Sequence, residues 1–170
     1  MIFYYQLPKL KVTDNVVLSI LDSEGNLVNS FSSITNENYV DYEGAPPKKP
    51  TITSNKGINR FVWNMRHSIL EGVPEVYIEG RFNGHKAIPG KYKVKLSYLD
   101  KNFEITSEII PNPMMSVSNN DFETYEVFMK DTENIYNQMT TMTNNFQKIK
   151  NEIEVLKIDL KKNVKEINKN

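Results

Sequence analysis

Residues 57–66, Gly-Ile-Asn-Arg-Phe-Val-Trp-Asn-Met-Arg, decide the fold class of the first two thirds of the chain. In this stretch Phe61, Trp63 and Met65 fall on one face of an extended chain, and polar side chains fall on the other. Such alternation is typical of a β-strand with one buried face. We therefore predict a strand here, with Trp63 in a hydrophobic core rather than on a sugar-stacking surface.

The same period of two recurs on both sides of this stretch. Further strands are expected at residues 3–7, 16–21, 27–31, 91–99 and 103–110, and residues 76–78 are expected to form a short strand or an extended piece. In the strand at 91–99, four side chains are expected to point inward: Tyr92, Val94, Leu96 and Tyr98. Residues 32–55 have the composition of a long, proline-rich surface loop. About seven short strands with turn signals between them predict an antiparallel β-sandwich.

Beyond Pro113 the pattern changes from strand to helix. All 8 prolines and all 7 glycines lie in the chain up to and including Pro113. Ser118 and Asp121 stand three residues apart, in the pattern of a capping box that starts a helix. These features predict a β-sandwich at residues 1–113 and a long helix or helical hairpin at residues 114–170. The first helix is expected to run from Ser118 to about Ile167.

Apolar residues in the helical part are spaced alternately three and four residues apart, which is typical of a coiled-coil seam. We call nine of them the apolar stripe and predict that they form an interaction surface: Phe128, Ile135, Met139, Met142, Phe146, Ile149, Ile153, Leu156 and Leu160. Residues 140–145 are rich in Thr and Asn, which are poor helix formers, so a kink or break there stays open. An unbroken helix of about 75 Å would overrun the sandwich. The stripe is then expected to pack on another helix, most simply that of a second copy.

Composition excludes several classes of function. The chain has 21 Lys+Arg and 21 Asp+Glu, so it lacks the basic excess of a nucleic-acid-binding domain. It has no cysteine, which excludes disulfides, thiolate metal sites and cysteine nucleophiles. No apolar run reaches the roughly 20 residues that a membrane span needs. The first residues lack the basic segment of a secretion signal, and the sequence leaves the compartment open.

No residue pattern in the sequence predicts a catalytic, cofactor or metal site. Nucleotide-binding loops, zinc-ligand spacing and nucleophile motifs do not occur. His67 and His85 are expected to be solvated or structural histidines. Arg60 and Arg66 are expected on the outer sheet face, where they pair with carboxylates rather than bind a ligand. No pair of carboxylates stands out as the acid and base of a glycosidase.

Three segments resemble a known family when they are taken in order. Residues 3–8 with 17–22 are similar to the opening of a bacterial immunoglobulin/fibronectin-like module. Residues 57–66 resemble its G-L-N-R-F-x-W-D-L-R signature, and residues 86–96 resemble its A-x-P-G-x-Y-x-V-x-L signature. Such modules stand at the C-terminal end of bacterial sortilin-like, BNR-repeat β-propeller proteins, often labelled as glycosyl hydrolases. The resemblance covers nearly the whole chain and implies an immunoglobulin- or fibronectin III-like sandwich followed by a helix.

The resemblance also implies what to expect of function. The propeller that would carry hydrolase activity is expected to be absent from this chain, and with it the helix that normally packs on the first one. Members of the family are typically exported. We therefore expect a non-catalytic accessory or interaction module, with no cofactor, whose partner is a protein and includes a β-propeller as one alternative. A stand-alone assembly protein that self-associates through its helix is the second hypothesis, and a carbohydrate-active domain is the third.

Overall fold

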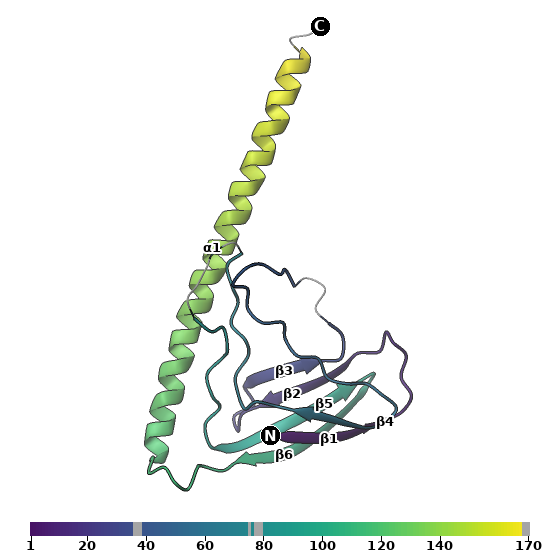
Figure 1. Cartoon of the computed structure of the whole chain (residues 1–170), viewed down its shortest axis with the longest axis vertical. Helices are drawn as coiled ribbons and strands as arrows, with labels where there is room; N and C mark the ends of the chain where they lie inside the picture. Colours follow the sequence, from purple (N-terminus) through teal and green to yellow (C-terminus); the bar gives the residue numbers. More distant parts are fainter. Residues whose placement is uncertain (36–38, 75, 77–79, 168–170) are drawn as a thin grey trace.

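The computed structural model describes residues 1–35, 39–74, 76 and 80–167, and it contains six β-strands and one long helix in these ranges (Figure 1). The strands are β1 (Ile2–Leu7), β2 (Val16–Leu21), β3 (Leu27–Ser32), β4 (Gly57–Val62), β5 (Gly90–Tyr98) and β6 (Lys101–Ile109). The helix is α1 (Asn119–Ile167). Within the described ranges, this helix is not apolar enough anywhere along its length to cross a membrane.

The strands form two antiparallel sheets whose inner faces share one core. β1 pairs with β4, and the second sheet has the order β3-β2-β5-β6. Phe31 of β3 packs on Phe61 of β4 with ring centroids 4.6 Å apart, which joins the two sheets. The prediction of an antiparallel sandwich followed by a helix is thus confirmed at this level.

The alternating residues of the sequence occupy the core as expected. Trp63 is 1% exposed, and its ring meets Tyr92 edge-on with centroids 5.8 Å apart. Phe61, Val94 and Tyr98 are also buried, whereas Leu96 is only partly buried. The indole N–H donates to the backbone oxygen of Arg66 at 2.9 Å, so the one polar atom of the Trp63 ring is satisfied.

Some sequence predictions about the sandwich are wrong. Met65 does not share the buried face of Trp63, because β4 ends at Val62 and Met65 adopts a positive φ of 56° with 39% of its surface exposed. Leu99 has a φ of 48° and belongs to the β5–β6 turn, so β5 ends one residue earlier than expected, at Tyr98, and β6 already begins at Lys101. Of the short strand or extended piece expected at 76–78, no strand is formed at Val76, and residues 77–79 lie outside the described ranges.

The helix begins and continues as the sequence predicts. Ser118 and Asp121 form the capping box: the Asp121 backbone N–H donates to Ser118 Oγ at 3.2 Å, and the Ser118 N–H donates to Asp121 Oδ2 at 3.0 Å. Residues 140–145 are helical, so the break left open there does not occur. With 49 residues, α1 is about 74 Å long and extends well beyond the sandwich (Figure 1).

Truncation of Trp63 tests the core. We expect Trp63→Ala to lower the free energy of unfolding by about 3–5 kcal/mol, because a fully buried indole leaves a cavity that the sheets cannot close. Denaturant unfolding measures this loss. The exposed Ile58 of β4 provides the control, and Ile58→Ala should change the stability by less than about 0.5 kcal/mol. Equal losses in the two variants would contradict the assignment of the core.

Candidate functional site

The helix packs on the rest of the chain through a polar face. Its least exposed residues recur three or four positions apart and have largely polar side chains: Phe122, Glu126, Met129, Glu133, Tyr136, Thr140, Asn144 and Gln147. Tyr136 donates its hydroxyl proton to the Glu71 backbone oxygen at 3.0 Å, and Asn144 Nδ2 donates to the Gly72 oxygen at 3.2 Å. Hydrogen bonds and charges, rather than an apolar face, therefore hold the helix.

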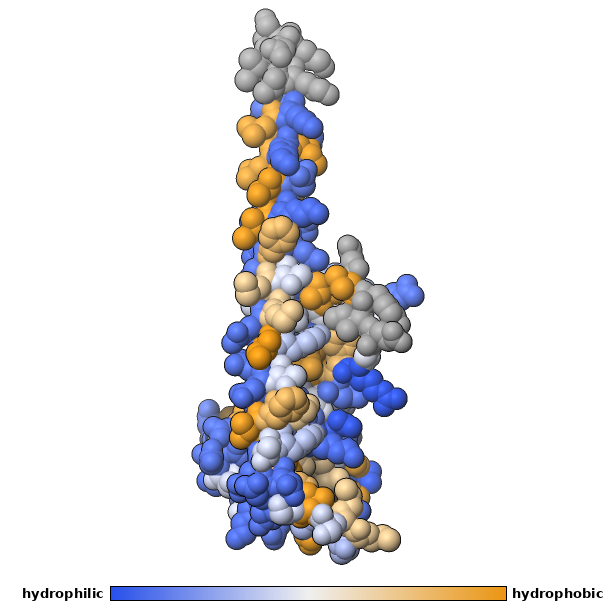
Figure 2. Space-filling model, turned by 90° about the vertical axis from the view of Figure 1, so that its left-hand side faces the viewer, coloured by the Kyte–Doolittle hydropathy of each residue, from blue (hydrophilic) through white to orange (hydrophobic). Residues whose placement is uncertain are grey.

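The apolar stripe faces solvent along its whole length. Its nine side chains are 47% to 72% exposed, and Figure 2 shows apolar side chains following one another up the helix. The packed residues Glu126, Glu133 and Thr140 directly follow Tyr125, Thr132 and Met139, which stand at seam positions seven residues apart. One residue corresponds to about 100° around an α-helix, so the stripe is turned away from the sandwich. The structure leaves its partner open.

Two buried histidines stand on the sandwich side of the helix contact. The segments 65–70 and 82–87 run antiparallel, with the His67 N–H donating to the His85 oxygen at 2.9 Å and the Ala87 N–H donating to the Met65 oxygen at 2.9 Å. Opposed residues in such a pair project from the same face. The two imidazoles accordingly stack, with centroids 3.7 Å apart and planes inclined by 20°.

Buried polar side chains hold the histidine segments in place. Asn29, which is 4% exposed, donates from Nδ2 to the backbone oxygens of Arg66 and His67 at 3.0 and 3.1 Å. Arg66 Nη1 donates to the Gly84 oxygen at 2.9 Å. Gly84 lies so close to His67 that an added Cβ would stand 2.6 Å from the His67 carbonyl carbon, which leaves room only for glycine. The segments are therefore fixed relative to each other before the helix is considered.

Two glutamates of the helix meet these histidines. Glu126 and Glu133 are seven residues apart and so lie on one face. Glu126 Oε2 is 3.1 Å from His85 Nε2, and its Oε1 is 3.3 Å from His67 Nε2. Glu133 Oε1 accepts the His85 backbone N–H at 2.8 Å and lies 2.8 Å from His85 Nδ1, off the direction of a ring hydrogen bond. We call these four residues the His–Glu cluster.

A lysine extends the His–Glu cluster to the β2–β3 hairpin. Lys130 Nζ is 3.1 Å from Glu126 Oε1 and 3.6 Å from Asp22 Oδ2. Asp22 also accepts the backbone N–H groups of Glu24 and Asn26, so the carboxylate is fixed by its own turn. The helix is therefore tied by charge both to the histidine segments and to a turn between two strands.

The electrostatics of the His–Glu cluster are those of an ion pair that is kept charged. Burial alone would lower the pKa of His85, but hydrogen bonds and the charges of Glu126 and Glu133 outweigh it and raise the pKa to about 9. Burial would raise the pKa of Glu126, yet His67, His85 and Lys130 hold it far below its usual range. The pKa of Glu133 is lowered in the same way, mainly by His85. Protonated His85 thus lies between two carboxylates.

One set of metal-binding atoms occurs within the His–Glu cluster. His67, His85 and Glu133 each bring one ligand atom within 4.8 Å of the others. Such donors suit Zn²⁺. An imidazole binds a metal in the plane of its ring, however, and the stacked rings place their planes side by side. No single ion lies in both planes, so the described geometry is that of a salt-bridge cluster and not of a metal centre.

Neither the His–Glu cluster nor the neighbouring cavities have the geometry of a glycosidase site. The general acid of such an enzyme has a raised pKa, whereas the pKa values of both cluster glutamates are lowered. The cavity beside His67 measures about 100 Å³, well below the size of typical ligand pockets. A larger cleft of about 640 Å³ lies between the proline-rich loop and the helix, and Glu71 is the one carboxylate among the described residues that line it.

The structure bears on the other residues that the sequence singled out. His67 and His85, expected to be solvated or structural, are both buried and therefore not solvated. Arg66 donates to the Gly84 backbone oxygen and Arg60 is exposed, and neither forms the predicted ion pair with a carboxylate of the described residues. Sequence reasoning missed Glu126 and Glu133 altogether. The sequence indicates Glu126 and Glu133 only through their spacing, since they are two acidic residues seven positions apart that each follow a seam position.

Comparisons with protein-family models, curated proteins and solved structures give no match to this chain.

The pKa values predict how pH affects the attachment of the helix. The pKa of His85 is raised from 6.5 to about 9 on folding, so its stabilisation is complete below pH 6.5 and is lost as the pH rises towards 9. The glutamates have lowered pKa values, so their contribution is present above about pH 4.5 and is lost as the pH falls below that value. Between pH 6.5 and 9.5 we expect the chain to lose about 1–2 kcal/mol of stability, since solvent screens part of the attraction.

Thermal unfolding across this pH range, compared with His85→Gln, measures the effect. Glutamine keeps hydrogen-bonding capacity but cannot titrate, so the variant should be less stable at pH 6 and should show a flatter dependence above pH 6.5. Parallel curves for wild type and variant would show that His85 does not carry the effect.

Proposed function

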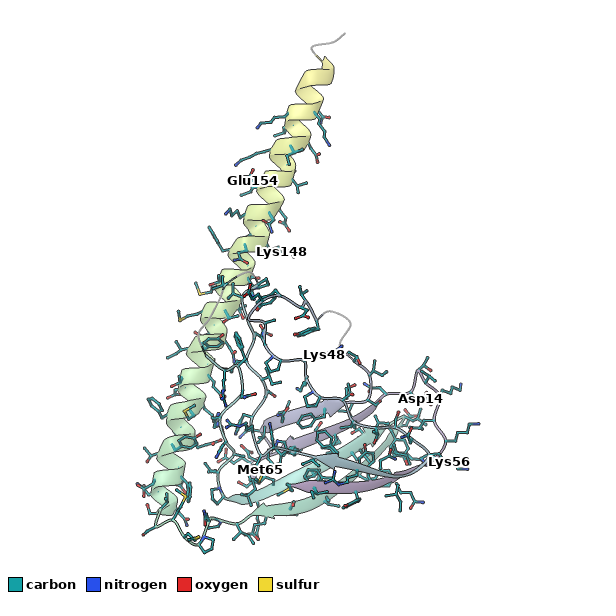
Figure 3. The ribbon with its side chains drawn as sticks, viewed as in Figure 1. Asp14, Lys48, Lys56, Met65, Lys148 and Glu154 are labelled. Carbon is teal, nitrogen blue, oxygen red and sulfur yellow. The ribbon has the colours of Figure 1, made fainter. Side chains whose placement is uncertain are left out.

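We propose that this protein is a non-catalytic interaction module that presents an apolar helix face to a helical partner. The sandwich and the His–Glu cluster hold one part of α1, and the rest of the helix extends from them. From Lys148 to Asn163 every described side chain is exposed. Figure 3 shows Lys148 and Glu154 on this extended part.

The observation that carries the proposal is the orientation of α1. An amphipathic helix of a compact domain normally turns its apolar face to the core. This helix does the opposite, because Glu126, Glu133 and Tyr136 face the chain while the apolar stripe faces solvent. Contiguous exposed apolar surface of this kind marks an interaction site. Burying a side chain such as Leu156 is worth roughly 1.5–3 kcal/mol before ordering costs, so a few of them suffice for association.

The resemblance to the C-terminal module of sortilin-like propeller proteins supports a particular setting for this role. In that setting the module is an accessory to a β-propeller, and the partner helix belongs to the propeller protein. The alternative is a stand-alone assembly protein in which α1 pairs with α1 of a second copy. Both settings use the same face of the helix, and they differ in the source of the partner.

Charge substitutions in the stripe test the proposed function. We expect Ile149→Asp/Leu156→Asp to abolish association between copies of the chain at tens of micromolar. A carboxylate buried in an apolar seam has a large desolvation cost. Val155→Asp/Ile158→Asp is the matched control, since these exposed residues lie in the same part of the helix but off the seam. The control should associate as the wild type does. Sedimentation velocity over a range of concentrations distinguishes them.

The same variants show whether the stripe belongs to the fold. At submicromolar concentration the stripe variant should unfold at the wild-type temperature, because both substituted side chains are more than half exposed in the single chain. A clear loss of stability in the dilute variant would mean that the stripe packs internally. Equal loss of association in the stripe variant and the control would mean that the helix associates through exposed apolar residues in general and not through the stripe. Either result contradicts the proposed function.

A further prediction concerns catalysis. We expect the purified chain to show no turnover of glycosides, because its best-placed carboxylates, Glu126 and Glu133, are both committed to His85. Chromogenic glycosides in a plate assay measure this. Turnover that disappears in Glu126→Gln, with the variant still folded by circular dichroism, would overturn the non-catalytic assignment.

A further inference from the structure

The charges that flank the apolar stripe identify its partner. We propose that α1 pairs with α1 of a second copy, parallel and in register, as a two-stranded coiled coil. This inference rests on the proposed function, because it uses the same face of the helix. It adds the identity of the partner and the direction in which the two helices run.

Opposite charges lie on the two flanks of the stripe in its extended part. Lys150 and Lys157 directly follow the stripe residues Ile149 and Leu156, which places both lysines on one flank. On the other flank, Glu152 and Asp159 directly precede Ile153 and Leu160. In heptad terms the lysines occupy e positions and the acids occupy g positions.

This distribution distinguishes the two directions of pairing. In a parallel pair the g flank of one helix faces the e flank of the other, so Glu152 meets Lys157 of the second copy, twice by symmetry. In an antiparallel pair like flanks meet, which sets lysine against lysine and acid against acid. In the single chain Lys157 pairs with Glu154 at 2.7 Å, but both groups are more than half exposed. Such a surface pair is weak and does not compete strongly.

The polar interruptions of the seam favour the same register. Thr132 and Asn163 occupy seam positions between apolar residues. In a parallel, in-register pair each faces its own copy, so hydroxyl meets hydroxyl and amide meets amide. In other registers Asn163 would face an apolar side chain and lose this hydrogen bond, whereas the Thr132 hydroxyl donates to the Phe128 oxygen of its own helix in any register. Ile153 stands at an a position and Leu156 at the following d position. Ile at a with Leu at d favours a parallel pair of helices.

The sandwiches leave room for this pairing. The face of α1 that packs on the sandwich lies about 100° around the helix from the stripe. A twofold axis along the seam therefore places the two sandwiches on opposite sides of the helix pair. Figure 2 shows the apolar face unobstructed beside the sandwich as well as beyond it.

Because the chain has no cysteine, single cysteines report the direction of pairing. Asn163→Cys lies at a seam position near one end of the helix, so a parallel pair brings the two thiols together and an antiparallel pair separates them. We expect most of the full-length variant to form a disulfide dimer under mild oxidation. Lys148→Cys, on the solvent side of the same helix, is the control and should remain largely uncrosslinked. Failure of Asn163→Cys to cross-link at concentrations where the wild type is dimeric overturns the parallel arrangement.

A charge exchange provides a second, independent readout. Lys157→Glu should weaken the dimer about tenfold, and Lys157→Glu/Glu152→Lys should restore it, because the pair is re-formed with its signs exchanged. An antiparallel dimer predicts the reverse, since the Lys157→Glu substitution relieves repulsion between lysines. A wild type that is strictly monomeric at several hundred micromolar also overturns the inference. The proposed function is judged separately, by the unfolding temperature of the dilute stripe variant.

Discussion

The structure depends on the ion pair between protonated His85 and two carboxylates of the helix. Glu126 and Glu133 enclose the imidazole, whose side chain is fully buried, and Glu126 also reaches Lys130 and His67. Removing one partner of such a buried group would leave an uncompensated charge, which is far more costly than losing a surface ion pair. The attachment of α1 to the sandwich is therefore specific in register, because a shift of the helix by one residue turns both glutamates away from His85.

This polar attachment explains why the apolar stripe is free. A helix has room for two different faces, and here the face toward the sandwich uses charges and hydrogen bonds from Glu126 to Asn144. An apolar seam buried against the sandwich would have removed the helix from any other partner. Holding the helix by its polar face fixes its direction and leaves the seam available. The buried cluster and the exposed stripe are thus complementary parts of one arrangement.

Local patterns in the sequence predicted the elements, while the site came from contacts that no local pattern records. The alternation around Trp63 and Tyr92 identified the core, and the capping box at Ser118 located the start of the helix, because both signals depend on neighbours in sequence. His85 and Glu133 are 48 residues apart and meet only because α1 packs on the irregular segment that carries His85. The outer position of Met65 was likewise not predictable, since it follows from a left-handed backbone conformation beyond the end of β4.

The two parts of α1 differ in what keeps them helical. Isolated helices shorter than about 12–15 residues are marginal in water, and most helices in proteins owe their stability to tertiary packing. Up to Gln147 the polar contacts with the sandwich and its loops supply that packing. From Lys148 to Asn163 every side chain is exposed, and the Glu154–Lys157 pair within the helix contributes only a few tenths of a kcal/mol. The attached part therefore acts as a nucleus from which the extended part continues, and a partner on the apolar stripe would stabilise the extended part as a helix. Binding of a partner at the stripe would in this way be coupled to helix formation in the extended part, while the His–Glu cluster sets the direction in which the helix leaves the sandwich.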